Sequence, residues 1–302
     1  MIQPRPLRVT RLLCDNSLKT ARRIRNAFTD LLAIGSLVLI PRTVLLAESP
    51  QPALKSIAFD IQLDTISSGF DKQSCWVHPR AGAIPGQTPI VVLTMQKAAI
   101  VGSDIFGPLN EMRTDNLGKS WTGPIEHAST LGLREEPDAI TIAPSDFWPK
   151  WHAKSGKLLG IGHNVRYQNN KVMPIRRRET IFSIYDPDQR SWTHWEELAM
   201  PDVDKFYGAG AGCVQRLDLP DGDILLPIYF APKGAKLTCV IVLRCGFDGQ
   251  RLSVKEMGNE LHLDTDRGLG EPSLTCFNDR YYVTMRNGCR PTGQTIRTLL
   301  SA

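Results

Sequence analysis

Apolar and polar positions alternate over short runs through most of the chain beyond about residue 55, and the 3.6-residue period of an amphipathic helix is almost absent. Turn-forming residues separate these runs, a pattern typical of short strands. The predicted strands are 90–96, 139–143, 157–165, 180–185, 213–219, 224–230, 237–246 and 252–256. Because no helical segments alternate with them, we expect a sandwich, barrel or propeller rather than a parallel α/β sheet.

A further hairpin is predicted near the end of the chain, between Glu271 and Arg286. If Asn278 and Asp279 form a two-residue turn, Glu271 pairs with Arg286 across the two strands. Alternation then gives the hairpin an apolar face and a polar face, with an acid and a guanidinium together at its open end. The pair is either an ordinary cross-strand salt bridge or a site in which Glu271 orients Arg286 toward an anionic ligand.

The N-terminal residues have the order of a secretory signal. A basic stretch runs to Arg25, an apolar run follows at 31–40, and Ala47 is a candidate cleavage point. The apolar run is shorter than a membrane span requires. Residues 1–47 are therefore predicted to be an export segment. Residues 48–302 are predicted to form one β domain that is periplasmic, at the cell surface or secreted, with no transmembrane span in the mature chain.

Charge and composition argue against several function classes. The chain has 36 Lys and Arg against 31 Asp and Glu, and much of the excess lies near the N-terminus, so no basic stripe for nucleic acid is expected. The internal arginine run 176–178 is followed by Glu179 and is interpreted as a solvated strand end or loop. The seven cysteines and six histidines lack the spacing of metal or redox sites. Neither a metal nor another cofactor is predicted, and His152 and His163 are expected to be structural.

The segment 114–121 resembles the Asp-box of the sialidase superfamily, a Ser/Thr-x-Asp-x-Gly-x-Thr-Trp repeat. Thr114, Asn116, Gly118 and Trp121 hold the defining positions, with Asn116 in place of the acid. In that family the box is a hairpin turn on the outer strands of a propeller blade, where the glycine permits a positive φ. The resemblance thus implies a structural marker rather than a catalytic group. A degenerate second copy is found at 185–192.

Glu271 and Pro272, followed fifteen positions after the glutamate by Arg286, resemble the Glu-Pro…Arg element of sialidases. The resemblance implies that Arg286 binds the carboxylate of sialic acid and that Glu271 assists a catalytic tyrosine, an exception among glycosidases. Arg80 lies ahead of the Asp-box, as the first arginine of the family does, and would be a second carboxylate ligand. Asp104, between Arg80 and the box, would be the general acid, or else an ordinary loop residue.

The resemblance covers about residues 76–286, whereas the third arginine and the nucleophilic tyrosine of the family lie further downstream. Residues 287–302 contain Arg290 and Arg297 but no tyrosine. The implied fold class is all-β, a six-bladed, sialidase-like β-propeller that is incomplete, with four to five blades present. A monomer is expected.

Two further segments could shape a sugar site. Residues 145–152 concentrate aromatic side chains, which form either a sugar-stacking wall or tryptophans buried between blades. The glycine-rich stretch 206–212 has no strand-to-helix context, so a phosphate-binding loop is not expected. It predicts instead a close approach of the backbone at an inner strand or at the mouth of a pocket.

Three functions remain open from the sequence. The first is an exo-α-sialidase-like glycoside hydrolase that removes a terminal acidic sugar from a glycan. The alternative is a noncatalytic propeller that binds glycan or protein and keeps Arg80 and Arg286 as an anion cradle. The third is hydrolysis of a different polysaccharide on the same fold, because a fold does not fix the chemistry. An acidic glycan is the expected partner, and nucleic acid is not.

Overall fold

The computed structural model describes residues 60–61, 63–101, 104–264 and 267–287, and the backbone of two further strands, β1 (Arg8–Val9) and β19 (Ile296–Ser301). The predicted export segment, 1–47, lies outside these residues apart from β1. The chain divides into two units, and the unit formed by Met1–Arg11 and Ile66–Ala302 contains all the described strands. In the described part of the chain, no helix is long and apolar enough to cross a membrane.

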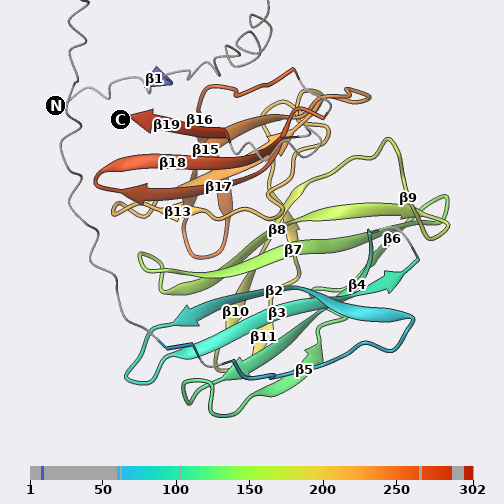
Figure 1. Ribbon diagram of the computed structural model, residues 1–302, viewed down its shortest axis with the longest axis vertical. Helices are drawn as coiled ribbons and strands as arrows, with labels where there is room; N and C mark the ends of the chain where they lie inside the picture. The colour runs from blue at the N-terminus through green and yellow to red at the C-terminus, as the bar shows by residue number, and fades with distance from the viewer. Residues whose placement is uncertain are drawn as a thin grey trace, which may run out of the picture. The chain divides into compact units, whose positions relative to one another are not determined.

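The described strands form four antiparallel sheets, and each sheet takes its strands from one stretch of the chain, β1 excepted (Figure 1). The first sheet holds β2 (Ser74–Ile84), β3 (Ile90–Ile100), β4 (Asp104–Thr114) and β5 (Thr122–Glu126). The second holds β6 (Arg134–Glu136), β7 (Ile140–His152), β8 (Lys157–Gln168), β9 (Lys171–Val172), β10 (Thr180–Asp186), β11 (Ser191–Trp192) and β12 (Glu196–Glu197). The third holds β13 (Leu217–Asp218), β14 (Ile224–Phe230), β15 (Cys239–Phe247) and β16 (Leu252–Met257). The fourth holds β17 (Leu269–Phe277) and β18 (Arg280–Asn287), followed by β19 and β1.

Successive antiparallel meanders of about four strands are the blades of a propeller, so the predicted all-β, propeller-type fold is confirmed. The described strands supply four such sheets, and the expectation that four to five blades are present stays a prediction. A total of six blades stays a prediction.

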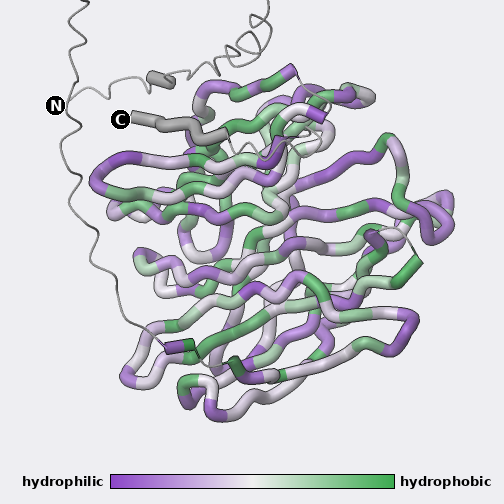
Figure 2. Tube along the Cα trace, viewed as in Figure 1, coloured by the Kyte–Doolittle hydropathy of each residue, from purple (hydrophilic) through white to green (hydrophobic). Residues whose placement is uncertain are grey.

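Apolar side chains fill the spaces between consecutive sheets, while green and purple positions alternate along the strands in Figure 2. Between the first two sheets lie Val92, Leu109, Phe147 and Leu158. Between the second and third lie Leu159, Phe182, Leu226 and Leu243. Between the third and fourth lie Val240, Leu269, Leu274 and Val283. Sheets that are consecutive in the chain therefore pack on one another as blades do, and the second and third sheets bury apolar side chains on both faces.

A buried polar junction also joins the first two sheets. Glu111 in β4 is only 3% exposed, and its carboxylate accepts hydrogen bonds from the Tyr185 hydroxyl at 2.8 Å and from the Trp192 indole nitrogen at 2.9 Å. His127 lies 3.0 Å from the same carboxylate. Because these groups are shielded from water, the junction stabilises the pairing of the two sheets only while all its partners are present.

The strand predictions hold where apolar residues form a nearly continuous run. The predicted 224–230 strand is β14, and the predicted strands at 157–165 and 180–185 lie within β8 and β10. The prediction for 213–219 is wrong except at β13, because Cys213 has a positive φ of 57° that breaks the extended backbone. β2 and β4 were not predicted, since Pro79 and Pro108 interrupt their patterns. Both prolines lie at register shifts, where a strand tolerates them.

The hairpin of β17 and β18 turns at Asn278 and Asp279 as predicted. Both residues have left-handed backbones, with φ of 48° and 56°, as a two-residue hairpin turn requires. The expected pairing holds from the turn back to Ser273, but a β-bulge beyond that point shifts the register by one residue. Arg286 therefore pairs with Gly270, and the predicted backbone pairing of Glu271 with Arg286 is wrong.

The turn at 114–121 joins β4 to β5 and is closed by the side chains of Thr114 and Asn116. The Asn116 carbonyl oxygen accepts hydrogen bonds from the Ser120 backbone N–H at 3.0 Å and from the Thr114 hydroxyl at 2.9 Å. Gly118 has a φ of +81°, and Trp121 is half-buried. The asparagine thus caps this turn as an aspartate would.

The equivalent loops of the next two sheets use an aspartate in the same way. The Oδ1 atom of Asp186, the last residue of β10, accepts two backbone N–H groups at 2.9 and 3.0 Å. The Oδ1 atom of Asp248, after β15, accepts two at 2.8 and 2.7 Å. Three sheets therefore share one capped turn before their outer strands.

Candidate functional site

A cavity of about 540 Å³ is lined by residues from all four sheets. Its charged lining residues are the acids Asp104, Asp146 and Glu271 and the bases Arg176, Arg178, Lys236, Arg267 and Arg286. Five cationic side chains against three carboxylates favour a ligand that carries negative charge. The rest of its polar lining includes two histidines, a cysteine and a tyrosine, groups that can bind or transfer protons.

Each sheet contributes one residue with a strained backbone to this cavity. These are His78 in β2, Asp146 in β7, Cys213 ahead of β13 and Glu271 in β17, with φ of 55°, 50°, 57° and 45°. In β2, β7 and β17 the strained residue lies in a β-bulge, which turns its side chain out of the regular alternation along the strand. The other non-glycine residues with positive φ, among those described, lie in turns or bends. Such strain costs about 1–3 kcal/mol per residue and concentrates at functional sites.

Asp146 lies at the centre of the buried part of the cavity. Its side chain is 10% exposed, and its Oδ1 atom lies 3.0 Å from Arg80 Nη2 and 3.5 Å from His78 Nδ1. Its Oδ2 atom lies 3.8 Å from His163 Nε2. Arg80 also reaches the Cys213 thiol, at 3.7 Å. The carboxylate is thus fixed between two sheets by an ion pair.

His163 and Tyr229 lie side by side next to Asp146. The Tyr229 hydroxyl is 3.4 Å from His163 Nδ1, and the Arg178 guanidinium lies 4.7 Å from the centre of the tyrosine ring. Burial, and then the charge of Arg178, lower the pKa of His163 to about 3 against the opposing effect of Asp146. Burial raises the pKa of Tyr229 to about 12, although Arg178 acts in the opposite direction. Both side chains are therefore neutral near pH 7.

Three of the four residues predicted for catalysis or carboxylate binding line the cavity. Glu271 and Arg286 form an ion pair of 2.7 Å despite the shifted register, and the Arg286 side chain is 60% exposed. Asp104 is exposed at the first residue of β4. Arg80 is brought to the same region but lies behind Asp146, with its guanidinium 5.5 Å from the centre of the Trp148 ring. Arg290 lies outside the described residues.

Sequence reasoning missed several lining residues. The interpretation of 176–178 as a solvated segment is wrong for Arg176 and Arg178, which line the cavity, and holds only for Arg177. The alternation of the three residues was the signal, because the first and third point to one side of an extended chain. Asp146, His163 and Tyr229 are distant in sequence, so no spacing could connect them. The structural role expected for His152 fits its bonds to Ser155 and to the Gly222 carbonyl.

The glycine-rich segment approaches His163 closely, as its sequence predicted for a pocket mouth. A Cβ atom added to Gly212 would lie 2.1 Å from His163 Nδ1, and one added to Gly210 would lie 2.5 Å from the Arg178 side chain. Only glycine fits at these two positions without displacing the lining residues.

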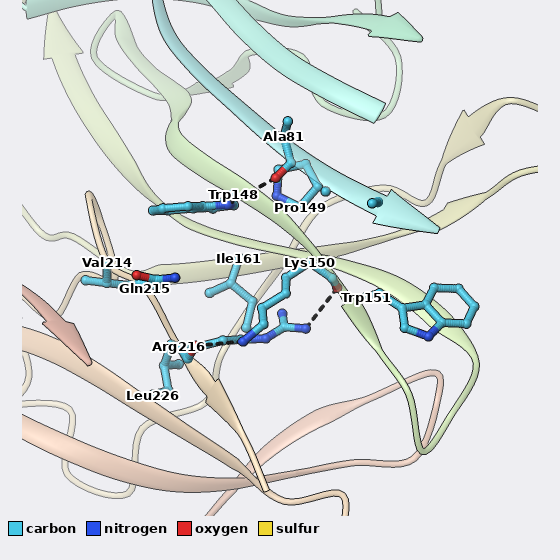
Figure 3. A pocket seen from close by; sticks show the side chains of 12 residues that line it. Ala81, Trp148, Pro149, Lys150, Trp151, Ile161, Val214, Gln215, Arg216 and Leu226 are labelled. Atoms are coloured by element: carbon cyan, nitrogen blue, oxygen red, sulfur yellow. Dashed lines mark hydrogen bonds between the residues drawn. The ribbon is translucent and has the colours of Figure 1, made fainter. Parts of the chain in front are cut away.

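A second cavity, of about 350 Å³, lies between β2, β7 and the segment ahead of β13 (Figure 3). Trp148 and Trp151 line it and are half-buried, whereas the neighbouring Phe147 is buried between sheets. Lys150 donates to the Arg216 carbonyl at 2.9 Å, and Arg216 donates to the Lys150 carbonyl at 3.0 Å. Since its cations bond backbone carbonyls of the wall, this cavity is a weaker candidate for an anion than the first.

Among the described residues, no group of three or more His, Cys, Asp or Glu side chains is placed to hold a metal ion.

Comparison with known proteins gave no matching family model and no matching curated protein. Similar solved structures include the sialidase of Trypanosoma rangeli, with 13% identity and a TM-score of 0.49 over 70% of this chain and 34% of that one. The same sialidase in complex with sialic acid gives 11% identity and a TM-score of 0.48 over 70% and 34%. A β-1,3-galactosidase of family GH43 gives 10% identity and a TM-score of 0.41 over 71% and 70%. The chain spans about a third of the length of the sialidases.

Proposed function

We propose that the cationic cavity binds a carboxylate-bearing sugar at the end of a glycan and that the chain acts as an exo-α-sialidase-like glycoside hydrolase. The observation that carries this proposal is the convergence of four strained residues, one from each sheet, on a cavity with more bases than acids. A purely structural ion-pair network would not need a left-handed backbone at each of these positions.

Arg286 is the principal ligand for the sugar carboxylate in this proposal. Its guanidinium is exposed to the cavity, and Glu271 holds one of its nitrogen atoms, which leaves the others for a bidentate contact. Arg176 and Arg178, in the segment ahead of β10, would provide a second contact to the carboxylate. The buried Nε atom of each has no hydrogen-bond partner within the described structure, so an anion would satisfy them.

Asp104 is the proposed general acid, because it is the exposed carboxyl of the lining and is free to reach a leaving-group oxygen. Arg80 acts indirectly, by fixing Asp146, and is proposed as an ancillary part of the anion cradle. The capped turns at 114–121 and 185–192 are proposed to be Asp-boxes, since their side chains bond the turn backbone as that motif requires. The protein is proposed to be an exported monomer.

Binding and turnover test this proposal separately. Calorimetry with N-acetylneuraminic acid measures binding, and a fluorogenic sialoside measures hydrolysis. Arg286→Ala is expected to weaken binding by about 10- to 100-fold, the effect of losing a charged hydrogen-bonding partner. Arg280→Ala, an exposed arginine at the turn end of the same hairpin, is the matched control. Equal affinity for the two variants would refute the role of Arg286.

The alternative function is a noncatalytic propeller that binds glycan or protein. It makes the same prediction for binding of the sugar to the Arg286 variant but predicts no hydrolysis by the unaltered protein. A folded protein that binds the sugar and releases no fluorophore would therefore favour a binding module.

A further inference from the structure

A third cavity, the adjoining cavity, has a volume of about 550 Å³ and lies between the segment ahead of β10 and the loop that joins β14 to β15. It meets the cationic cavity along five shared lining residues, which are Pro174, Arg176, Arg178, Lys236 and Thr238. Each of the two volumes is within the range of about 300–1,000 Å³ that ligand pockets occupy. One ligand can therefore extend from the cationic cavity into the adjoining cavity.

The adjoining cavity has positively charged walls. Its charged lining residues are Arg176, Arg178 and Lys236, and no carboxylate lines it among the residues that the structure describes. Within those residues none of the three cations forms an ion pair, whereas Arg166 of β8 pairs with Glu179. Burial, and then the charge of Arg178, lower the pKa of Arg176, because like charges lie close together. An anionic group of a ligand would relieve this repulsion.

Uncharged partners hold the two arginines in place. Arg176 Nη1 donates a hydrogen bond to the Met173 carbonyl at 2.8 Å, and the Arg178 guanidinium lies 4.7 Å from the centre of the Tyr229 ring. The buried Nε atom of each arginine has no hydrogen-bond partner in the described structure. These contacts orient both guanidinium groups and leave their charges available to a ligand.

The position of Asp104 indicates which part of a glycan the adjoining cavity would hold. As the proposed general acid, Asp104 protonates the oxygen that links the terminal sugar to the next sugar. The charge of Asp104 acts on Arg176, which lines both cavities. Arg286, the proposed ligand of the terminal carboxylate, lines the cationic cavity and is not among the residues that line the adjoining cavity. The leaving sugar would therefore lie on the side of Arg176 and extend into the adjoining cavity.

The uncharged walls of the adjoining cavity suit a sugar ring. Tyr207 is half-buried and lines the adjoining cavity but not the cationic one, so its ring offers an apolar face for stacking. The loop residues 232–235 are exposed, and a Cβ atom added to Gly234 would meet no atom within 4 Å. The cavity is thus open to solvent at this loop, as a site for a longer glycan requires.

We infer that the adjoining cavity is a subsite for the sugar next to the terminal one and that it binds an anionic group on that sugar. The preferred substrate is then a glycan with a negative charge on each of its last two sugars, the second charge being a carboxylate or a sulfate ester. Lys236 binds this second group, and Arg176 and Arg178 lie between the two charges. The inference rests on the proposed function, because the terminal sugar must bind in the cationic cavity.

Calorimetry with four ligands tests the inference. The ligands are N-acetylneuraminic acid, sialyllactose, sialyllactose with a sulfate ester on its galactose, and a disaccharide of two N-acetylneuraminic acids. The glycosidic oxygen of the terminal sugar is replaced by sulfur in the last three, so that none is cleaved during the measurement. At least one of the two doubly charged ligands should bind about tenfold or more tightly than sialyllactose, whose second sugar is neutral. The tighter of the two identifies the source of the second charge.

Two pairs of variants locate the second charge. Ala235 is exposed and lines the adjoining cavity but not the cationic one. Ala235→Glu adds a carboxylate there and should reduce the preference for the doubly charged ligand to about twofold or less, while Ala235→Gln, the neutral control, should keep it. Lys236→Gln should reduce the same preference at least about threefold. Lys233→Gln, on the same loop but outside both linings, should leave it unchanged.

The outcomes separate this inference from the proposed function. If N-acetylneuraminic acid binds and neither doubly charged ligand binds more tightly than sialyllactose, the inference fails and the proposed function stands. A preference that persists in full in Ala235→Glu and Lys236→Gln also overturns the inference, because the second charge then binds elsewhere. If the unaltered protein binds none of the four ligands, both fail.

Discussion

His163→Gln is expected to make the stability of the folded protein less sensitive to acid. The imidazole is buried in the folded state, among Arg178, Arg176, His78 and Asp146, and its pKa falls from the ordinary 6.5 to about 3. The unfolded chain therefore binds a proton on this residue at mildly acidic pH, whereas the folded chain does not. Stability that is present above pH 6.5 is lost progressively as the pH falls toward 3.

The size of this loss of stability can be worked out from the one proton that His163 binds in the unfolded chain. Each pH unit in this window changes the free energy of unfolding by about 1.4 kcal/mol for one proton. Between pH 7 and pH 4.5, His163 thus accounts for a loss of about 2.5 kcal/mol. Glutamine has a similar size and cannot take up the proton, so the variant should escape this part of the acid destabilisation.

Urea denaturation at pH 7 and pH 4.5 measures the effect for the unaltered protein and for His163→Gln. Carboxylates contribute to the pH dependence of both proteins, so the difference between the two pH-dependent losses isolates His163. His194→Gln, at an exposed position, is the matched control. The reasoning is refuted if the unaltered protein and His163→Gln lose equal stability on acidification.

Three further changes test the scaffold, each by urea denaturation at pH 7. Glu111→Ala should destabilise the fold by about 3 kcal/mol or more, because it leaves the buried donors of Tyr185 and Trp192 in the second sheet without an acceptor. A loss below about 1 kcal/mol would contradict this. Asn116→Ala should cost about 1 kcal/mol through the loss of the bond to Ser120, and an unchanged midpoint would show that the turn does not need its cap. Asp279→Gly should stabilise the hairpin by about 0.5–1 kcal/mol, because residue 279 has a φ of 56°, and any destabilisation would count against a strained turn there.

The fold class and the turn of the last hairpin could be predicted from the sequence because both depend on local pattern. Alternation indicated the strands, and Asn278 with Asp279 indicated a left-handed turn. The bulges could not be predicted. Pro79 and Pro272 weaken a strand pattern, yet each lies where a bulge removes the need for a ladder hydrogen bond. The pairing of Glu271 with Arg286 failed for this reason, although their side chains still meet.

The candidate site was predictable only in part. Glu271 and Arg286 belong to one hairpin, so the distance along the chain was enough to bring them together. His163 and Tyr229 meet through the packing of two sheets, and a single sequence carries no local signal for that packing. The glycines at 210 and 212 were the one indirect sign, since they marked a close approach without identifying its partner.

The four strained cavity residues belong to four sheets, each of which is held together by its own hydrogen-bond ladder. No single sheet carries the cavity, and its dimensions depend on the spacing between sheets. A small loosening between neighbouring sheets would separate the four residues while every ladder stayed intact. On heating, sugar binding should therefore disappear before the circular dichroism of the strands does, and crosslinking adjacent sheets should protect binding more than it protects strand content.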